Sequence, residues 1–141
     1  MRNHELISVF YKKQPTYNPQ KTTGHVLKSS YKTKGLQSEV YGRNTKDSYY
    51  HSSERFPRSI QVFSTDTQKP VALFEYLIKT YTNEVNLVLD NCIGSGTTAI
   101  ACINTNRNFI GFELEKRYFK IAKKRIEERK NEISLFDNFT I

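Results

Sequence analysis

Long apolar runs are missing from this chain of 141 residues. A membrane-spanning helix needs about 20 predominantly apolar residues in succession, and no stretch approaches that length. The start, MRNHELISVFYKK, also lacks the apolar core of a secretory signal. These absences predict a cytoplasmic protein that contacts no membrane.

Cysteine is almost absent. Cys92 and Cys102 are the two cysteines of the sequence; they form no CxxC pair, and no histidine lies near them along the chain. We therefore expect free reduced thiols, no disulfide and no metal site.

Acidic residues are scarce in the first part of the chain. Residues 1–63 hold 11 basic and 4 acidic residues, whereas residues 64–141 hold 11 and 10, and the formal net charge is +8. A basic segment favours a polyanion, most often nucleic acid, although it also serves general solubility. The length suits one domain with a modest core.

Two zones precede the regular part of the sequence. Residues 5–11, ELISVFY, are β-prone and predict a strand. Residues 12–58 are rich in Lys, Tyr, Ser, Thr and Asn, which is typical of an irregular, loop-dominated region. Six of the nine tyrosines lie in residues 1–63, which favours an ordered module over a disordered linker. Tyrosines interleaved with lysines can stack on bases and meet phosphates, or they can pack a small core of their own.

The third zone begins with a strand and a helix. SIQVF, residues 59–63, predicts a short strand. Pro70 then suits a first helical turn, where its missing N–H costs nothing. The apolar residues that follow at helical spacing are Val71, Phe74, Leu77, Ile78 and Tyr81.

The remaining elements alternate between strands and helices. NLVLD (86–90) predicts a buried parallel strand, TTAIACINT a short helix and RNFIGFE (107–113) a second strand. KRYFKIAKKRIEERK predicts a basic amphipathic helix. Its inward side carries Tyr118, Ile121, Ala122, Arg125 and Ile126. The order predicts an α/β fold with one right-handed βαβ unit and parallel strands, too few for a complete doubly wound sheet.

A glycine turn follows the first of these strands. Gly94-Ser95-Gly96-Thr97-Thr98-Ala99 fits the spacing G-x-G-x-x-G/A of nucleotide-binding turns, where glycine permits positive φ and close approach of a ligand. Asp90 ends the strand before the turn, and Glu113 ends the next strand. A carboxylate at the second position can accept hydrogen bonds from ribose hydroxyls, or it can merely solvate the strand end.

Three ligands compete for this pattern. A phosphate-binding loop needs Gly-Lys-Ser/Thr, whereas Thr97 follows Gly96 here. NAD would place its pyrophosphate close to the Asp90 carboxylate, which disfavours it but leaves a dehydrogenase as the weaker alternative. S-adenosylmethionine carries an adenosine for Glu113, an ammonium and a sulfonium for Asp90, and no phosphate.

The combined motifs resemble a known family. DNCIGSGTT, with TQKPVALFEYLI before it and NFIGFELEKRYFKIAKKRI after it, resembles the DNA amino-methyltransferases in their beta arrangement, the restriction-modification and phage type. There the catalytic half comes first, then target recognition, then the cofactor-binding half. The resemblance covers nearly the whole chain and implies a partial Rossmann-like methyltransferase fold. Residues 1–11 would be an edge strand of its sheet, 12–58 the target-recognition region and 59–141 the S-adenosylmethionine-binding subdomain.

The resemblance also implies site residues. Asp90 would hold the amino group of the cofactor, Glu113 its ribose, and residues 67–70 would complete the methionine pocket. The predicted cofactor-binding residues are Thr67, Gln68, Lys69, Pro70, Asp90, Cys92, Gly94, Ser95, Gly96, Thr97, Thr98 and Glu113. The predicted DNA-binding residues are Lys12, Lys13, Lys32, Lys34, Arg43, Tyr49 and Tyr50, of which the two tyrosines would stack on a base or form an exposed loop pair.

This sequence departs from the family pattern at three places. Thr65-Asp66 stand where the family commonly has His-Pro, and Cys92 stands where an aromatic is common. The catalytic signature ends in Pro-Pro and an aromatic, whereas the four prolines here, at positions 15, 19, 57 and 70, are isolated.

The missing signature affects the predicted reaction. Methylating the exocyclic amine of adenine or cytosine requires a flipped base and an amine oriented for in-line attack. We therefore predict no catalytic residue in this chain, and a separate N-terminal half that carries the catalytic loop for methylation of double-stranded DNA. A non-catalytic DNA-binding protein and an inactive methyltransferase remnant are the alternatives.

Overall fold

The structure is a computed structural model that describes residues 6–32, 37–38, 42–43, 47–58, 60–63 and 69–137. The chain divides into two units, each described by itself. One comprises the described residues up to Asn18 and from Val62 onward, and the other is Pro19–Gln61. The division lies near the predicted boundaries at 12 and 58, but it leaves Lys12 and Lys13 in the first unit.

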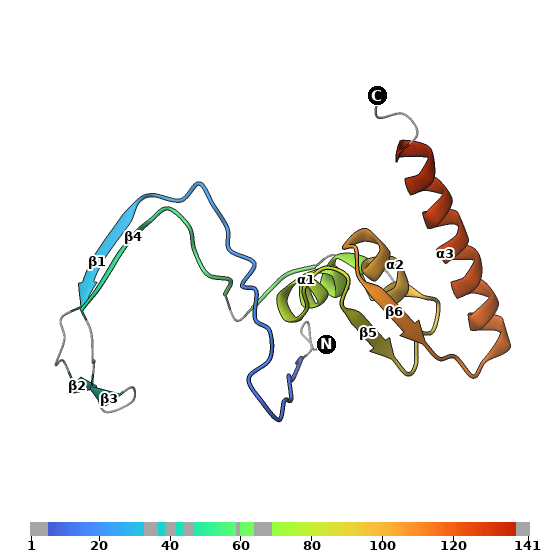
Figure 1. Cartoon of the computed structure of the whole chain (residues 1–141), viewed down its shortest axis with the longest axis horizontal. Coiled ribbons are helices and arrows are strands. Elements are labelled where there is room, and N and C mark those ends of the chain that lie inside the picture. The colour runs from blue at the N-terminus through green and yellow to red at the C-terminus, as the bar shows by residue number, and fades with distance from the viewer. Residues whose placement is uncertain are drawn as a thin grey trace, which may run out of the picture. The chain divides into compact units, whose positions relative to one another are not determined.

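Three helices and two parallel strands make up most of the first unit (Figure 1). In chain order they are α1 (Val71–Tyr81), β5 (Leu87–Asp90), α2 (Thr97–Asn104), β6 (Asn108–Gly111) and α3 (Lys116–Asp137). β5 and β6 pair in parallel, and α2 connects them. The predicted helices and the parallel βαβ unit of a partial Rossmann-like fold are therefore confirmed.

The core lies between the helices and one face of the sheet. Ile78 of α1 packs with Ala101 and Cys102 of α2, and Val88 of β5 and Phe109 of β6 contact this cluster. Side chains alternate along a strand, so the neighbours of Val88 point the other way. These neighbours, Leu87 and Leu89, are 59% and 66% exposed. The prediction of a buried strand therefore holds for one face only in the described residues, because the described helices cover that face.

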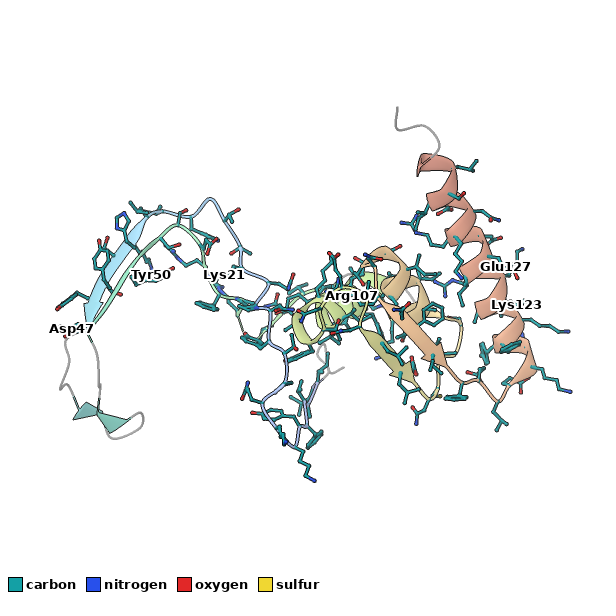
Figure 2. The ribbon with its side chains drawn as sticks, viewed as in Figure 1. Lys21, Asp47, Tyr50, Arg107, Lys123 and Glu127 are labelled. Atoms are coloured by element: carbon teal, nitrogen blue, oxygen red, sulfur yellow. The ribbon has the colours of Figure 1, made fainter. Side chains whose placement is uncertain are left out.

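Two polar side chains from distant segments hold the end of α1. The amide nitrogen Nδ2 of Asn18 donates to the carbonyls of Lys79, at 3.2 Å, and Thr82, at 3.0 Å. Arg107, labelled in Figure 2, donates from Nη2 to the Thr82 carbonyl at 2.9 Å and from Nε to the Thr82 hydroxyl at 3.2 Å. The last carbonyls of a helix lack partners within it, so these contacts stabilise the helix end.

Two predicted strands are not formed in the described residues. Residues 6–11 and 60–63 have no strand conformation. Glu5 and Ser59, the first residues of the two predicted strands, lie outside the described residues. Leu6 and Phe10 are each 91% exposed. A β-prone stretch becomes a strand only where a neighbouring edge pairs with its N–H and C=O groups, and no described segment does so here.

The second unit is built on a two-stranded antiparallel ribbon, called the ribbon below. It joins β1 (Lys28–Lys32) and β4 (Ser48–Ser52), and a smaller pair joins β2 (Gln37–Ser38) and β3 (Gly42–Arg43). Outside the ribbon strands, the backbone groups of Thr22 and Arg55 form two hydrogen bonds with each other, of 3.0 and 2.9 Å. The loop-dominated region that the sequence predicts thus also contains two short strand pairs, which the sequence pattern did not indicate because strands open to solvent need no apolar alternation.

Burial of Cys102 makes the stability of the first unit depend on pH. Burial raises the pKa of the Cys102 thiol from 9.0 to about 11, an effect that the nearby Arg107 partly offsets. The folded state therefore keeps a proton that the unfolded chain loses above pH 9. The resulting stabilisation is complete below pH 9 and is lost as the pH rises toward 11.

We expect the free energy of unfolding in urea to fall between pH 9 and pH 11. Cys102→Ala should have a lower free energy of unfolding at every pH and a smaller decrease between pH 9 and pH 11. Cys92→Ala, which removes an exposed thiol, should show the same decrease as wild type. Equal pH slopes for wild type and Cys102→Ala would contradict the assignment.

Candidate functional site

Backbone pairing continues beyond the ends of β5 and β6. The N–H of Phe112 donates to the Asp90 carbonyl at 2.9 Å, and the N–H of Ile93 donates to the Phe112 carbonyl at 3.0 Å. This pairing places the turn after β5 beside the segment after β6. The N–H of Gly94 then donates to Oε2 of Glu113 at 2.8 Å. Both predicted carboxylates therefore lie at one edge of the sheet, around the glycine turn.

Asp90 connects the turn to the start of α2. Its Oδ1 accepts the N–H of Cys92 at 2.9 Å, and its Oδ2 accepts the hydroxyl of the buried Thr98 at 2.5 Å. A carboxylate has about four acceptor positions, so these two bonds leave the half-buried Asp90 able to accept more.

Glu113 is held in a similar way. In addition to the bond with Gly94, its Oε1 accepts the N–H of Glu115 at 2.9 Å. Two backbone donors from the segments before and after it thus fix the carboxylate. A further donor, such as a ligand hydroxyl, can bind without displacing either one.

The two glycines of the turn have different surroundings. Gly94 and Gly96 have φ of 56° and 89°, a region that glycine enters without steric cost. A Cβ at Gly94 would meet nothing within 4 Å, whereas one at Gly96 would lie 3.1 Å from both Cα and Cβ of Ala122. Gly96 therefore allows α2 to pack closely on α3, and its predicted contact with a cofactor stays a prediction.

Arg125 anchors the turn from α3. Its Nη1 donates to the carbonyl of Ser95 at 2.7 Å and to the Ser95 hydroxyl at 3.1 Å. The sequence gives a signal for this contact, because Arg125 is a charged residue on the otherwise apolar inward side of the predicted helix.

Gly111 of β6 makes room for a side chain of the turn, a role that the sequence analysis did not predict. A Cβ there would come within 2.3 Å of Cδ1 of Ile93, so only glycine lets this buried side chain cross β6. Nothing in the local sequence pattern distinguishes Gly111 from any other glycine in a strand.

A hollow of about 450 Å³ opens beside the turn, and we call it the acidic hollow. It is lined by Cys92, Gly94, Ser95, Glu113, Glu115 and Tyr118. Its volume lies in the range of small-molecule sites, about 300–1,000 Å³. Two of these six residues are carboxylates and none is basic, so the site disfavours phosphate groups and suits a neutral or cationic ligand.

The structure brings together part of the predicted cofactor set. Cys92, Gly94, Ser95 and Glu113 line the acidic hollow. Four others lie at the turn and the start of α2 without lining the hollow: Asp90, Gly96, Thr97 and Thr98. Lys69 and Pro70 precede α1 and do not line it either, and Thr67 and Gln68 lie outside the described residues. Sequence reasoning did not assign Glu115 and Tyr118 to the site.

The predicted DNA-binding residues divide between the units. Lys12 and Lys13 are exposed in the first unit, and Tyr49 and Tyr50 are exposed in β4. Consecutive residues of a strand point to opposite faces, so the two tyrosines face opposite sides of β4 and are not a loop pair, and stacking of either one on a base stays a prediction. Lys32 lies in β1 and Arg43 in β3, but the structure does not describe their side chains. Lys34 lies outside the described residues.

The described residues contain neither a cluster of metal ligands nor a helix that could span a membrane. In these parts of the chain, no three His, Cys, Asp or Glu side chains are arranged to hold a metal ion. None of the described helices has the length and apolar character needed to cross a bilayer.

Comparison with known proteins identifies the family. The model of a family described as DNA methylase matches residues 1–124. The chain belongs to the DNA methylase family. The resemblance to DNA amino-methyltransferases that the motifs carry is thereby confirmed.

Individual relatives of this methylase chain are type II methyltransferases. It is 41% identical to M.HpaI of Haemophilus parainfluenzae over 71 residues, which cover 50% of this chain and 23% of the relative. It is 30% identical to M.BglII of Bacillus subtilis over 143 residues, which cover 96% of this chain and 39% of the relative. The crystal structure of M1.HpyAVI is 30% identical, with a TM-score of 0.45 over 72% of this chain and 60% of that one. The chain thus spans less than half the length of these two curated relatives.

The different surroundings of the two turn glycines predict different costs of substitution. An L-residue in the left-handed region costs about 1–2 kcal/mol, and we expect Gly94→Ala to lose about that much stability. Gly96→Ala adds a clash with the backbone of α3 and should lose clearly more. Urea unfolding of both variants measures the difference, and equal losses would show that Gly96 does not set the packing distance.

Proposed function

We propose that this chain is the cofactor-binding and target-recognition part of a methylase that acts on double-stranded DNA in the cytoplasm. The methyl group would move from S-adenosylmethionine to the exocyclic amine of adenine or cytosine. The observation that carries the proposal is the placement of Asp90 and Glu113 around an open glycine turn, in a chain of the DNA methylase family.

The acidic hollow fits this cofactor better than a dinucleotide. Glu113 has acceptor positions left for ribose hydroxyls, and the exposed ring of Tyr118 offers an apolar surface to an adenine. The carboxylates of Glu115 in the hollow and of Asp90 at the turn beside it favour a ligand that carries positive charge. The pyrophosphate of NAD would meet these carboxylates without a basic residue among those lining the hollow, which disfavours the dehydrogenase alternative.

The residues of this chain would bind and orient rather than carry out the chemistry. When bound, the cofactor supplies a methyl group on a positively charged sulfur. Asp90 would hold the ammonium group and Glu113 the ribose, which fixes the direction in which the methyl group faces. The methyl group would pass to the exocyclic amine of the base, which would lose a proton, while Asp90 and Glu113 would keep the cofactor in place.

Orientation of the amine is the role for which this chain offers no candidate. Its prolines are isolated, so the Pro-Pro loop of the family pattern is not among these residues. We infer that a complementing polypeptide supplies this loop. Exposed apolar side chains on the sheet support the inference: Leu87 and Leu89 of β5 lie beside Ile110 of β6, which is paired with Leu89, and a contiguous apolar surface marks an interaction site.

Calorimetric titration with S-adenosylmethionine tests the cofactor assignment. Asp90→Asn removes a charge-assisted hydrogen bond worth about 1.5–3 kcal/mol, so we expect affinity to fall by about 10-fold or more. Methylthioadenosine lacks the amino group and should bind both proteins with similar affinity. Glu84→Gln is the matched control, since it removes the same charge at the other end of β5, where Glu84 accepts a bond from Asn106 at 3.4 Å.

The control and the second ligand decide the interpretation. If Asp90→Asn binds neither S-adenosylmethionine nor methylthioadenosine and also unfolds at a lower urea concentration, then Asp90 only supports the turn. Wild type that binds neither ligand would contradict the proposed function.

Transfer of labelled methyl groups into unmethylated duplex DNA tests the division of roles. We expect no transfer by this chain alone and transfer when it is mixed with a folded N-terminal methylase polypeptide that carries the Pro-Pro loop. Asp90→Asn should lower the rate in the mixture, whereas Glu84→Gln should not. Full activity of this chain alone would show that it contains its own catalytic residues.

A further inference from the structure

The two faces of the ribbon differ in chemistry. Ser29 is paired with His51 and Tyr31 with Tyr49, and directly paired residues of antiparallel strands point to the same side. Tyr31 and Tyr49 are 64% and 67% exposed on this face. On the opposite face, Tyr50, labelled in Figure 2, donates its hydroxyl to the Glu54 carbonyl at 2.7 Å. One tyrosine thus stabilises the base of the ribbon, while the other face presents open aromatic rings.

His51 is held on the open face by two hydroxyl groups. Its Nδ1 lies 2.6 Å from the hydroxyl of Ser29 and 3.2 Å from the hydroxyl of Tyr49. The rings of Tyr49 and His51 are stacked, with centroids 5.9 Å apart and planes at 10°. These three contacts fix both the position and the orientation of an exposed imidazole.

The short contact favours one tautomer of His51. Hydroxyl donors make shorter hydrogen bonds than N–H donors, so 2.6 Å fits a Ser29 hydroxyl that donates to an unprotonated Nδ1. In the neutral ring the proton then resides on Nε2. Within the described residues no acceptor contacts Nε2, so in this tautomer His51 presents one donor to the solvent.

The shape and charge of the second unit match duplex DNA. The major groove is about 12 Å wide and admits a two-stranded ribbon. Residues 19–61 hold 8 basic and 3 acidic residues, and neither β1 nor β4 contains an acid. This excess of positive charge favours approach to phosphates on both sides of a groove.

We propose that the ribbon enters the major groove of the target DNA and that His51 reads one base by donating from Nε2 to the N7 atom of a purine. N7 is the major-groove acceptor that guanine and adenine share, and a single ring donor satisfies it. Tyr31 and Tyr49 lie on the same face, two positions further along the ribbon, and contact the neighbouring base edges. The inference rests on the proposed function, because it names how the same methylase selects its DNA.

Selection from a library of duplexes with randomised positions tests the role of His51. The full chain, with S-adenosylmethionine present, enriches a sequence with one or more fixed purines. In His51→Phe the preference at one of these purines falls by at least about fivefold, since loss of a specific base contact costs about 1–3 kcal/mol. His25→Phe is the matched control, because His25 is exposed in the same unit and bonds to Thr22 outside the ribbon strands.

Replacing the base tests the same contact from the other side. A duplex with 7-deazapurine at that position lacks N7 and binds wild type at least about fivefold more weakly. His51→Phe binds the natural and modified duplexes equally. His51→Gln keeps a side-chain donor and retains part of the preference, which separates loss of the contact from loss of the fold.

The contact is disproved if wild type selects no sequence, if His51→Phe selects the same bases with the same strength, or if 7-deazapurine leaves wild-type affinity unchanged. Titration with S-adenosylmethionine runs beside the selection. A wild type that binds the cofactor while His51→Phe selects normally overturns this inference alone, whereas failure of wild type to bind the cofactor overturns the proposed function.

Discussion

The pairing of backbone groups beyond the ends of β5 and β6 is the interaction on which the site depends. Two hydrogen bonds, from Phe112 to Asp90 and from Ile93 to Phe112, bring the turn after one strand beside the segment after the other. Without them the Glu113 carboxylate would not reach the N–H of Gly94. Parallel strands end at the same edge of a sheet, and this extension converts that general property into two carboxylates around a single turn.

Each element that packs on the turn makes a separate contribution. Asp90 of β5 accepts a bond from Thr98 of α2, Arg125 of α3 holds Ser95, and Gly96 admits the close approach of Ala122. Contacts with α2 and α3 therefore hold the turn in place, while Gly94 remains open on the side of the acidic hollow. A preorganised site of this kind spends less binding energy on ordering its own residues when a ligand arrives.

Sequence patterns predicted secondary structure correctly where burial of one face imposes a regular spacing of apolar residues. They failed where no such burial occurs. The spacing of apolar residues predicted α1, because Ile78 and the half-buried Val71 and Phe74 face one core. Residues 6–11 have strand-like composition, but no described edge pairs with them, so the same reasoning misled there. The ribbon was missed for the opposite reason, since its Ser, Lys and Tyr residues form strands while open to solvent.

The sequence by itself determined the order of strands and helices from Val71 onward, the glycine turn and the carboxylates at the strand ends, because each of these depends on residues close together along the chain. Tertiary structure decided which contacts those residues make. That Gly96 faces Ala122, that Gly111 makes room for Ile93 and that Ser29 orients His51 all depend on segments at least 18 residues apart. Local patterns do not encode which distant side chains meet, since that follows only from strand register and helix packing.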